Sequence, residues 1–314
     1  MSLKEHSMRT STSQRKVYVA MGAWDLEPFD KYFYPPKPKK GFRKLQYYSQ
    51  FFDSVEVNAT FYNASFTPAH AKRWLADVAE NQEFVFTVKL YRGFTHTFNA
   101  RGEDVKVIHN FLGPLEEAGK LGGLLLQFPY SFTNIKERRI YLVQLSKVLQ
   151  PHRLFIEVRH KSWNPDPSGL MYNFFQENKL HLVNVDLPQI GRHMPLTALA
   201  CDGYAYFRMM GRNGVNWRHP ERGDRYLYHY SDEELRHLLS LMEYVKATAH
   251  TTFVVFHNDP EANSLVNGFR LRHLLLHGQR VLMPQNMIKV FPQLKAMSAE
   301  VNTLHPLFAC ASDQ

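Results

Sequence analysis

The stretch VEVNATFYNASFTPAHAKRW, residues 55–74, joins an apolar strand to polar groups at its end. Side chains alternate between the two faces of a strand, so Glu56 and Asn58, two residues apart, are expected on one face. Thr67 then stands where a helix N-cap is favoured, and Pro68 occupies the first helical position. A strand, a polar loop and a helix in this order make one βα unit, which is the first indication of the fold.

Eight strand-like runs recur along the chain, and helical patterns fill most of the intervals between them. The mean repeat is about 34 residues, which is the length that a βα unit needs. Strands that are apolar on both faces and alternate with helices indicate a parallel sheet covered by helices. Eight repeats without a reversal of the sheet predict an α/β fold with a single closed (β/α)8 TIM barrel. The predicted strands are Val17–Met21, Ser54–Val57, Phe84–Lys89, Leu124–Phe128, Leu154–Val158, His181–Asp186, Tyr204–Met209 and Thr252–Phe256.

The chain is expected to be one domain, residues 17–280, with a disordered tail over 1–16 and an extension over 281–314 that packs a helix on the barrel. Two cysteines without a CxxC motif exclude a disulfide framework and a cysteine zinc site, and favour a reducing cytoplasm. No apolar run approaches the ~20 residues of a membrane span. Residues 1–16 also lack the apolar segment of a secretory signal, so a cytoplasmic protein is expected.

The net charge of +9 is concentrated in two short segments. Residues 1–16 carry +3 and residues 37–44 (KPKKGFRK) carry +5, which leaves +1 for the rest of the chain. Basic segments attract nucleic acid or phosphorylated ligands, although a solvated tail and loop explain the same charge.

Polar side chains follow the predicted strands at their C-terminal ends, where barrel enzymes carry their chemistry. An unpaired charge inside a barrel costs several kcal/mol, so the acids and cations there are expected to compensate each other. Such a cluster is either an active or binding site or an ion-pair network that closes the barrel. The catalytic candidates are Glu157, Glu56, Asp186, His160 and His96; the ligand-binding candidates are Trp24, Asn58, Tyr62, Lys89, Gln127, Arg159, Trp163, Arg208, Arg212 and Asn258.

Glu157 is the first candidate for a general acid or base, with a salt bridge to Arg159 or Arg208 as the alternative. Trp24 and Trp163 suit either a flat ligand or the core. No GxSxG, HExxH, Walker A or GxGxxG motif is present, so no cofactor is indicated. A divalent metal is conceivable between acids from different strands, but no spacing supports it.

Several segments in this order resemble the YecE-like family, number 72 among the domains of unknown function. They cover about Val17 to Leu274 and include VEVNATFYNASFTPAHAKRW (55–74), FVFTVKLYRGFTH (84–96), LGGLLLQFPYSF (121–132), IEVRHKSW (156–163), VNVDLP (183–188), YFRMMGR (206–212) and VVFHNDPEANSLVNGFRL (254–271).

The resemblance implies a TIM barrel and no particular reaction. Its motif residues coincide with the strand ends named above. Three positions depart from the family pattern: MGAW at 21–24 replaces Gly-Thr-Ser-Gly-Trp, Met210 replaces a His, and His257-Asn258 replaces a pair of Asn. If that His carries protons or binds ligand in relatives, Met210 alters rate or substrate here, or abolishes activity.

Three functions are consistent with these observations. The first is an enzyme of the hydrolase or isomerase class that acts by acid/base chemistry on a small polar or phosphorylated ligand. The second is a nucleic-acid-binding or nucleic-acid-processing protein that uses the basic loop 37–44. The third is a small-ligand binder without catalysis.

Overall fold

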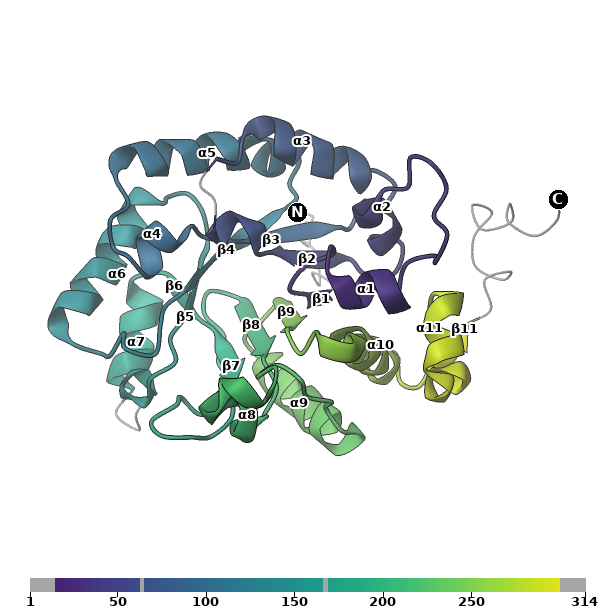
Figure 1. Cartoon of the computed structure of the whole chain (residues 1–314). Helices are drawn as coiled ribbons and strands as arrows, with labels where there is room; N and C mark the ends of the chain where they lie inside the picture. The colour runs from purple at the N-terminus through teal and green to yellow at the C-terminus, as the bar shows by residue number, and fades with distance from the viewer. Residues whose placement is uncertain (1–14, 63–64, 166–168, 300–314) are drawn as a thin grey trace, which may run out of the picture.

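The computed structural model describes residues 15–62, 65–165 and 169–299. Parallel strands form a nearly closed barrel in the order β6-β5-β4-β3-β2-β1-β9-β8-β7 (Figure 1). β6 and β7 are two parts of one predicted strand, interrupted at Val183; the first part pairs with β5 and the second with β8. All eight predicted strands are therefore present and the TIM-barrel-like fold is confirmed. The strands are β1 (Lys16–Met21), β2 (Ser54–Val57), β3 (Val85–Lys89), β4 (Leu121–Gln127), β5 (Leu154–Glu157), β6 (Leu180–Leu182), β7 (Asn184–Asp186), β8 (Tyr204–Met209) and β9 (Thr251–Phe256).

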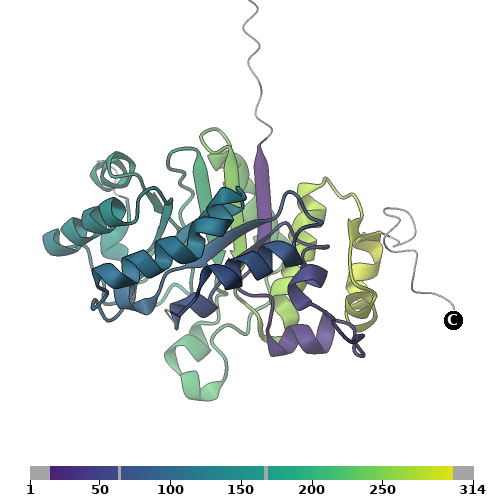
Figure 2. The same ribbon diagram turned by 90° about the horizontal axis from the view of Figure 1, so that it is seen from above.

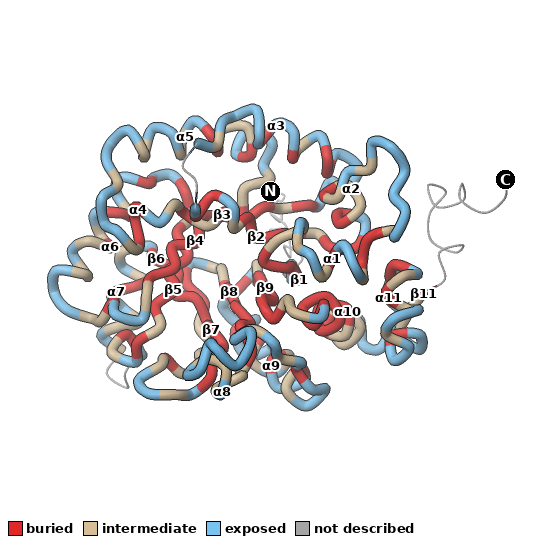
Figure 3. Tube along the Cα trace, in the orientation of Figure 1, coloured by how far each residue is buried: buried red, intermediate tan, exposed pale blue. Residues whose placement is uncertain are grey.

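Helices surround the barrel and turn one face to solvent, as the alternation of buried and exposed segments in Figure 3 shows. A capping box begins α9: the side chain of Ser231 accepts from Glu234 N, and Glu234 Oε2 accepts from Ser231 N. The helices are α1 (Glu27–Tyr32), α2 (Lys44–Tyr48), α3 (Pro68–Asp77), α4 (Arg92–Thr95), α5 (Gly102–Glu117), α6 (Lys136–Val148), α7 (Leu170–Glu177), α8 (Gly214–Arg218), α9 (Asp232–Val245), α10 (Asn263–Leu275) and α11 (Gln285–Val290).

Two apolar clusters divide the core. The larger one lies between the strands and the helices, and the smaller one fills the barrel with residues such as Tyr18, Phe155, Tyr206 and Phe253. Because successive strand residues point to opposite faces, each of these interior residues fixes which of its neighbours also point inward. The interior set predicts, for example, that Glu157 points inward, two residues after Phe155.

The C-terminal segment forms α11, a 3-10 helix at Pro292–Met297 and a two-stranded parallel sheet of β10 (Val281–Leu282) and β11 (Ser298–Ala299). In Figure 1 it lies at the outside of the barrel, beside α10 and α1. Residues 300–314 and most of the tail predicted over 1–16 lie outside the described residues, and Lys16 already begins β1. In the part of the chain that the structure describes, no helix is long and apolar enough to cross a membrane.

Candidate functional site

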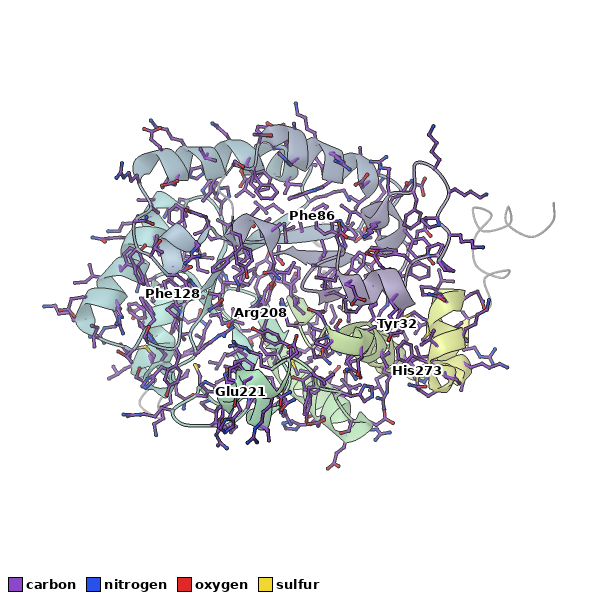
Figure 4. The ribbon with its side chains drawn as sticks, viewed as in Figure 1. Tyr32, Phe86, Phe128, Arg208, Glu221 and His273 are labelled. Atoms are coloured by element: carbon purple, nitrogen blue, oxygen red, sulfur yellow. The ribbon has the colours of Figure 1, made fainter. Side chains whose placement is uncertain are left out.

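A buried ion cluster lies inside the barrel below its C-terminal mouth. Arg208 on β8 is near the centre of the ring of strands (Figure 4) and is 2% exposed. It donates from Nε to Glu56 Oε2 (2.9 Å) and from Nη2 to Glu56 Oε1 (2.6 Å), and from Nη1 to Glu157 Oε2. Glu56 and Glu157 come from β2 and β5 and are fully buried. One guanidinium thus joins two carboxylates across the barrel, the geometry for which Arg is suited.

Further groups complete the surroundings of Glu56. Tyr206 OH donates to Glu56 Oε2 (2.7 Å) and lies 3.0 Å from Thr87 Oγ1. His257 Nε2 lies 3.0 Å from Glu56 Oε1, outside the angles of a hydrogen bond. Tyr206 precedes Arg208 by two residues on β8, so both side chains point inward. Every oxygen of the Glu56 carboxylate is therefore engaged from inside the barrel.

The protonation of the cluster follows from its geometry. Burial acts to raise the pKa of Glu56, but Arg208 and, to a smaller extent, the neighbouring His257 outweigh it and hold this pKa well below its usual value. Burial likewise opposes ionisation of Glu157, yet Arg208 and Arg159 lower its pKa to about 2. Burial would lower the pKa of Arg208, and the two carboxylates raise it instead. All three groups are charged at neutral pH and neutralise one another in part.

A second layer of side chains lies nearer the mouth. Arg159 donates from Nε to Glu157 Oε1 (2.8 Å). Lys89, the last residue of β3, places Nζ 4.1 Å from the centroid of the Phe61 ring. Burial and the charge of Arg208 lower the pKa of Lys89 to about 7. Burial and the charge of Lys89 lower the pKa of His96, which follows α4, to about 4. Lys89 therefore changes charge near neutral pH, while His96 is neutral there.

The mouth contains a cavity of about 550 Å³, within the usual range for a small-molecule site. Among the described residues its lining has five cationic side chains of Lys or Arg and one carboxylate, so the cavity is positively charged. The lining consists of Asn58, Phe61, Tyr62, Lys89, Arg92, His96, Gln127, Pro129, Tyr130, Arg159, His193, Arg208, Met210, Trp217, Arg225, Tyr226, His257 and Asp259. A larger cavity of about 820 Å³ lies elsewhere, at the starts of β4 and β5, where Glu116, His152 and Asp202 line it.

Three predicted site residues, Asp186, Arg212 and Asn258, lie outside this cavity. Val183, Val185 and Leu187 fill the barrel interior, so Asp186 must point outward. Asp186 accepts from Arg212 Nε (2.9 Å) and from Tyr230 OH (2.7 Å) in a separate cluster. Asn258 follows the inward His257 and donates to Asn267 Oδ1 on α10 (2.8 Å). Asp186 is thus bonded to the segment between β8 and α9, and Asn258 is bonded to α10.

Of the predicted aromatic and loop residues described next, only one lines the mouth cavity. Trp163 is fully buried, and its indole N–H donates to Phe132 O (2.7 Å). Trp24 contacts Trp74 edge to face with the ring centroids 5.5 Å apart. His160 caps the 3-10 helix Lys161–Trp163 through its side chain. None of these three lines the mouth cavity, whereas Tyr62 does and is 75% exposed.

Several lining residues are absent from the sequence-based candidates. Arg92 belongs to the short helix α4 after β3, and Trp217, Arg225 and Tyr226 come from the long segment between β8 and α9. Figure 2 shows α8, which contains Trp217, at the opposite end of the barrel from the start of β1. The length of that segment, at the mouth end of a barrel strand, is the signal that could have identified them.

The metal and nucleic-acid hypotheses gain no support from the geometry. Over residues 15–62, 65–165 and 169–299, no group of three or more His, Cys, Asp or Glu side chains is arranged to hold a metal ion. In the basic loop, Lys44 pairs with Asp25 (2.5 Å) and Asp30 (2.6 Å), and Arg43 pairs with Asp77. The exposed cations that remain in the loop are Lys37, Lys39 and Lys40.

The fold and the site define a TIM-barrel-like protein with a cationic cavity at the C-terminal ends of its strands. Residues 18–289 match the family model described as "Protein of unknown function DUF72", and the chain belongs to this family. It is 30% identical over 275 residues to the UPF0759 protein YunF of Bacillus subtilis (strain 168), covering 82% of this chain and 94% of that protein.

Solved structures agree with the fold. A DUF72 family protein from Thermotoga maritima MSB8 is 26% identical, with a TM-score of 0.70 over 83% of this chain and 99% of that one. Another from Enterococcus faecalis V583 is 23% identical, with a TM-score of 0.72 over 86% of this chain and 99% of that one, a likeness that concerns the fold alone.

Proposed function

We propose that the protein is an enzyme that binds a small anionic ligand at the mouth of the barrel and acts on it by proton transfer, in the hydrolase or isomerase class. The observation that carries the proposal is the charge of the cavity: among the described residues, Lys89 and four arginines line it, against Asp259 in the lining and the two buried carboxylates that pair with Arg159 and Arg208 beneath it. Such an excess of positive charge attracts phosphate or carboxylate groups and favours negative charge that develops during a reaction.

The arginines differ in what they offer a ligand. Each nitrogen of Arg208 donates one hydrogen bond to Glu56 or Glu157, and the side chain is 2% exposed, so at most one N–H of each Nη group remains for a ligand. Arg159 uses Nε for Glu157, which leaves its Nη groups to the cavity that it lines. Arg92 also lines the cavity, and its planar donor fork suits a phosphate or carboxylate.

Aromatic rings give the cavity a second chemical character. Phe61, Tyr62, Tyr130, Trp217 and Tyr226 are all in its lining. Tyr130 and Trp217 each lie against His193, with ring centroids 5.2 Å and 5.9 Å apart. Aromatic faces pack well against a ring or a sugar. A ligand with an anionic group and a flat or cyclic body fits both features.

Lys89 is the group best suited to proton transfer. A catalytic pKa near the working pH is most effective, and that of Lys89 is about 7. Glu157 instead has both oxygens engaged by Arg159 and Arg208, is fully buried, and has a pKa of about 2. These surroundings favour a role for Glu157 in holding the two arginines, in place of the acid/base role that the sequence predicts. Neutral His96 lies beside Lys89 as a hydrogen-bonding group.

A turnover screen tests the proposal. The purified protein is incubated with mixtures of phosphorylated sugars, nucleotides and organic acids, and products are followed by mass spectrometry and phosphorus NMR. Turnover of an anionic compound is expected in the wild type and its loss in Lys89→Met. The matched control is Lys147→Met, which removes an exposed lysine on α6. Unchanged turnover in Lys89→Met, or turnover of uncharged compounds alone, would refute the proposal.

A further inference from the structure

The amine of Lys89 differs from the other cations of the site in having no acidic partner. Among the residues that the structure describes, no carboxylate oxygen lies within 4.0 Å of Lys89 Nζ, whereas Arg208 and Arg159 are both paired with Glu157. Its Nζ lies over the face of Phe61, 4.1 Å from the ring centroid. The lysine therefore faces the cavity with its nitrogen available to a ligand.

This environment favours the neutral form of the amine. Burial removes water from the ammonium group, and the guanidinium of Arg208 repels its charge, so the pKa of Lys89 lies at about 7. A lysine desolvated and placed beside another cation is the arrangement that activates an amine as a nucleophile. An ordinary lysine, with a pKa near 10.4, holds only about one neutral amine in 2,500 at pH 7, against about one in two here.

We propose that Lys89 is a covalent nucleophile that forms an imine with an aldehyde or ketone bearing a carboxylate or phosphate group. The inference rests on the proposed function, because the anionic group is held by the arginines that line the same cavity. Arg92 lies three residues after Lys89 at the start of α4, and Arg159 reaches the cavity from the end of β5. An anion bound between them brings its carbonyl carbon to the lysine.

The covalent step balances without any further reactant. The lone pair of the Lys89 nitrogen forms a bond to the carbonyl carbon, and the electrons of the C=O π bond move to oxygen. One N–H proton passes to that oxygen, which gives a carbinolamine. A second proton, from the solvent or a neighbouring acid, lets the oxygen leave as water, and the nitrogen lone pair forms the C=N bond of a protonated imine. The positive iminium then acidifies the adjacent C–H, which suits the isomerase class.

Borohydride trapping tests the inference on the full-length protein. Pyruvate supplies a ketone with a carboxylate, glyceraldehyde 3-phosphate supplies an aldehyde with a phosphate, and acetone is the uncharged counterpart. Sodium borohydride reduces any imine to a stable secondary amine, and peptide mass mapping locates it. Labelling by an anionic probe is expected at Lys89, at about ten-fold or more above exposed lysines, and much less with acetone. Its extent should rise with pH through about 7.

Internal and variant controls keep the outcome interpretable. Lys120 donates from Nζ to the carbonyls of Asn81, Gln82 and Phe84, so it should stay unlabelled in the same sample. Lys89→Arg removes the primary amine and keeps a cationic side chain, and its labelling should disappear while its melting temperature confirms folding. Label spread over surface lysines, equal label in Lys89→Arg, or no label with either anionic probe overturns the imine. If anionic compounds are still turned over in that case, the proposed function stands and only the covalent step fails.

Discussion

Replacing Glu157 by Gln removes one charge from the buried cluster and leaves its shape almost unchanged. A pKa lowered from 4.5 to about 2 by Arg208 and Arg159 corresponds to about 3 kcal/mol of stabilisation at neutral pH. Removing one partner of a buried ion pair lowers the free energy of unfolding by about 3–5 kcal/mol, a range that agrees with this value. Glu157→Gln is therefore expected to lower the free energy of unfolding by about 3 kcal/mol at pH 7.

The effect has a defined dependence on pH. The pKa of Glu157 is depressed in the folded state, so its contribution is complete above about 4.5 and is lost as pH falls toward about 2. The difference between wild type and Glu157→Gln should accordingly shrink between pH 5 and pH 3. This follows because the wild type loses the stabilisation that the variant never had.

Urea denaturation, followed by circular dichroism and tryptophan fluorescence together, measures this difference where the two transitions coincide. The matched control is Glu243→Gln, which removes an exposed carboxylate that pairs with Lys246 on α9. That change should alter stability at pH 7 by no more than about 0.5 kcal/mol. A loss below about 1 kcal/mol for Glu157→Gln at pH 7, or a difference that stays constant down to pH 3, would show that the cluster is not held as described.

Three further predictions concern other parts of the site and core. Turnover of the ligand should rise with pH through about 7, where Lys89 loses its proton, and a flat profile from pH 6 to 8 would contradict that role. Trp163→Phe should lower the free energy of unfolding, measured by urea denaturation, by about 1–3 kcal/mol, because it leaves the carbonyl of buried Phe132 without its hydrogen-bond donor. A loss of only a few tenths of a kcal/mol would show that this hydrogen bond does not stabilise the protein. Gly22→Ala places a Cβ 2.1 Å from Cε1 of His257, so the imidazole ring must move away from Glu56. The free energy of unfolding should fall by about 1–3 kcal/mol, and the NMR signals of the imidazole should shift. Unchanged signals would mean that the backbone moves instead of the ring.

The barrel could be predicted from the sequence because its signal is repeated. Each strand is a short apolar run closed by polar residues, and eight such runs at a regular interval leave few alternatives. One helix start was also predicted: Pro68 begins α3 after Thr67 at the N-cap. These features depend on residues that are close together in the sequence, so they can be predicted from it.

The site could be predicted only in part, because the sequence does not always show which strand residues point into the barrel. Where an interior aromatic fixes the alternation, as Phe155 does for Glu157, the polar residue points into the barrel. Asp186 stands at an equivalent strand end but alternates with interior valines, so it points outward. When a strand is apolar on both faces, its sequence does not show which alternate residues point into the barrel.

The individual loop residues could not be predicted for a different reason, although the length of the segment between β8 and α9 indicates that it could contribute to the mouth. Arg92, Trp217 and Arg225 reach the cavity because whole segments fold over the mouth, and no local pattern marks that path. Met210 also lines the cavity and packs with the interior cluster, at the position where the family pattern has a His. A methionine side chain cannot transfer a proton, so in this chain the proposed chemistry depends more on Lys89.

The central claim is that the mouth of the barrel binds anions through its arginines. It is tested most directly by the melting temperature of the wild type and of Arg159→Gln in the presence of glucose 6-phosphate, pyruvate, glucose and acetone. A ligand that binds only the folded protein raises the melting temperature with its concentration. The account predicts stabilisation by at least one charged compound, none by its uncharged counterpart, and a clear reduction in Arg159→Gln. Equal stabilisation by charged and uncharged compounds, or an anion effect that Arg159→Gln leaves unchanged, would contradict it.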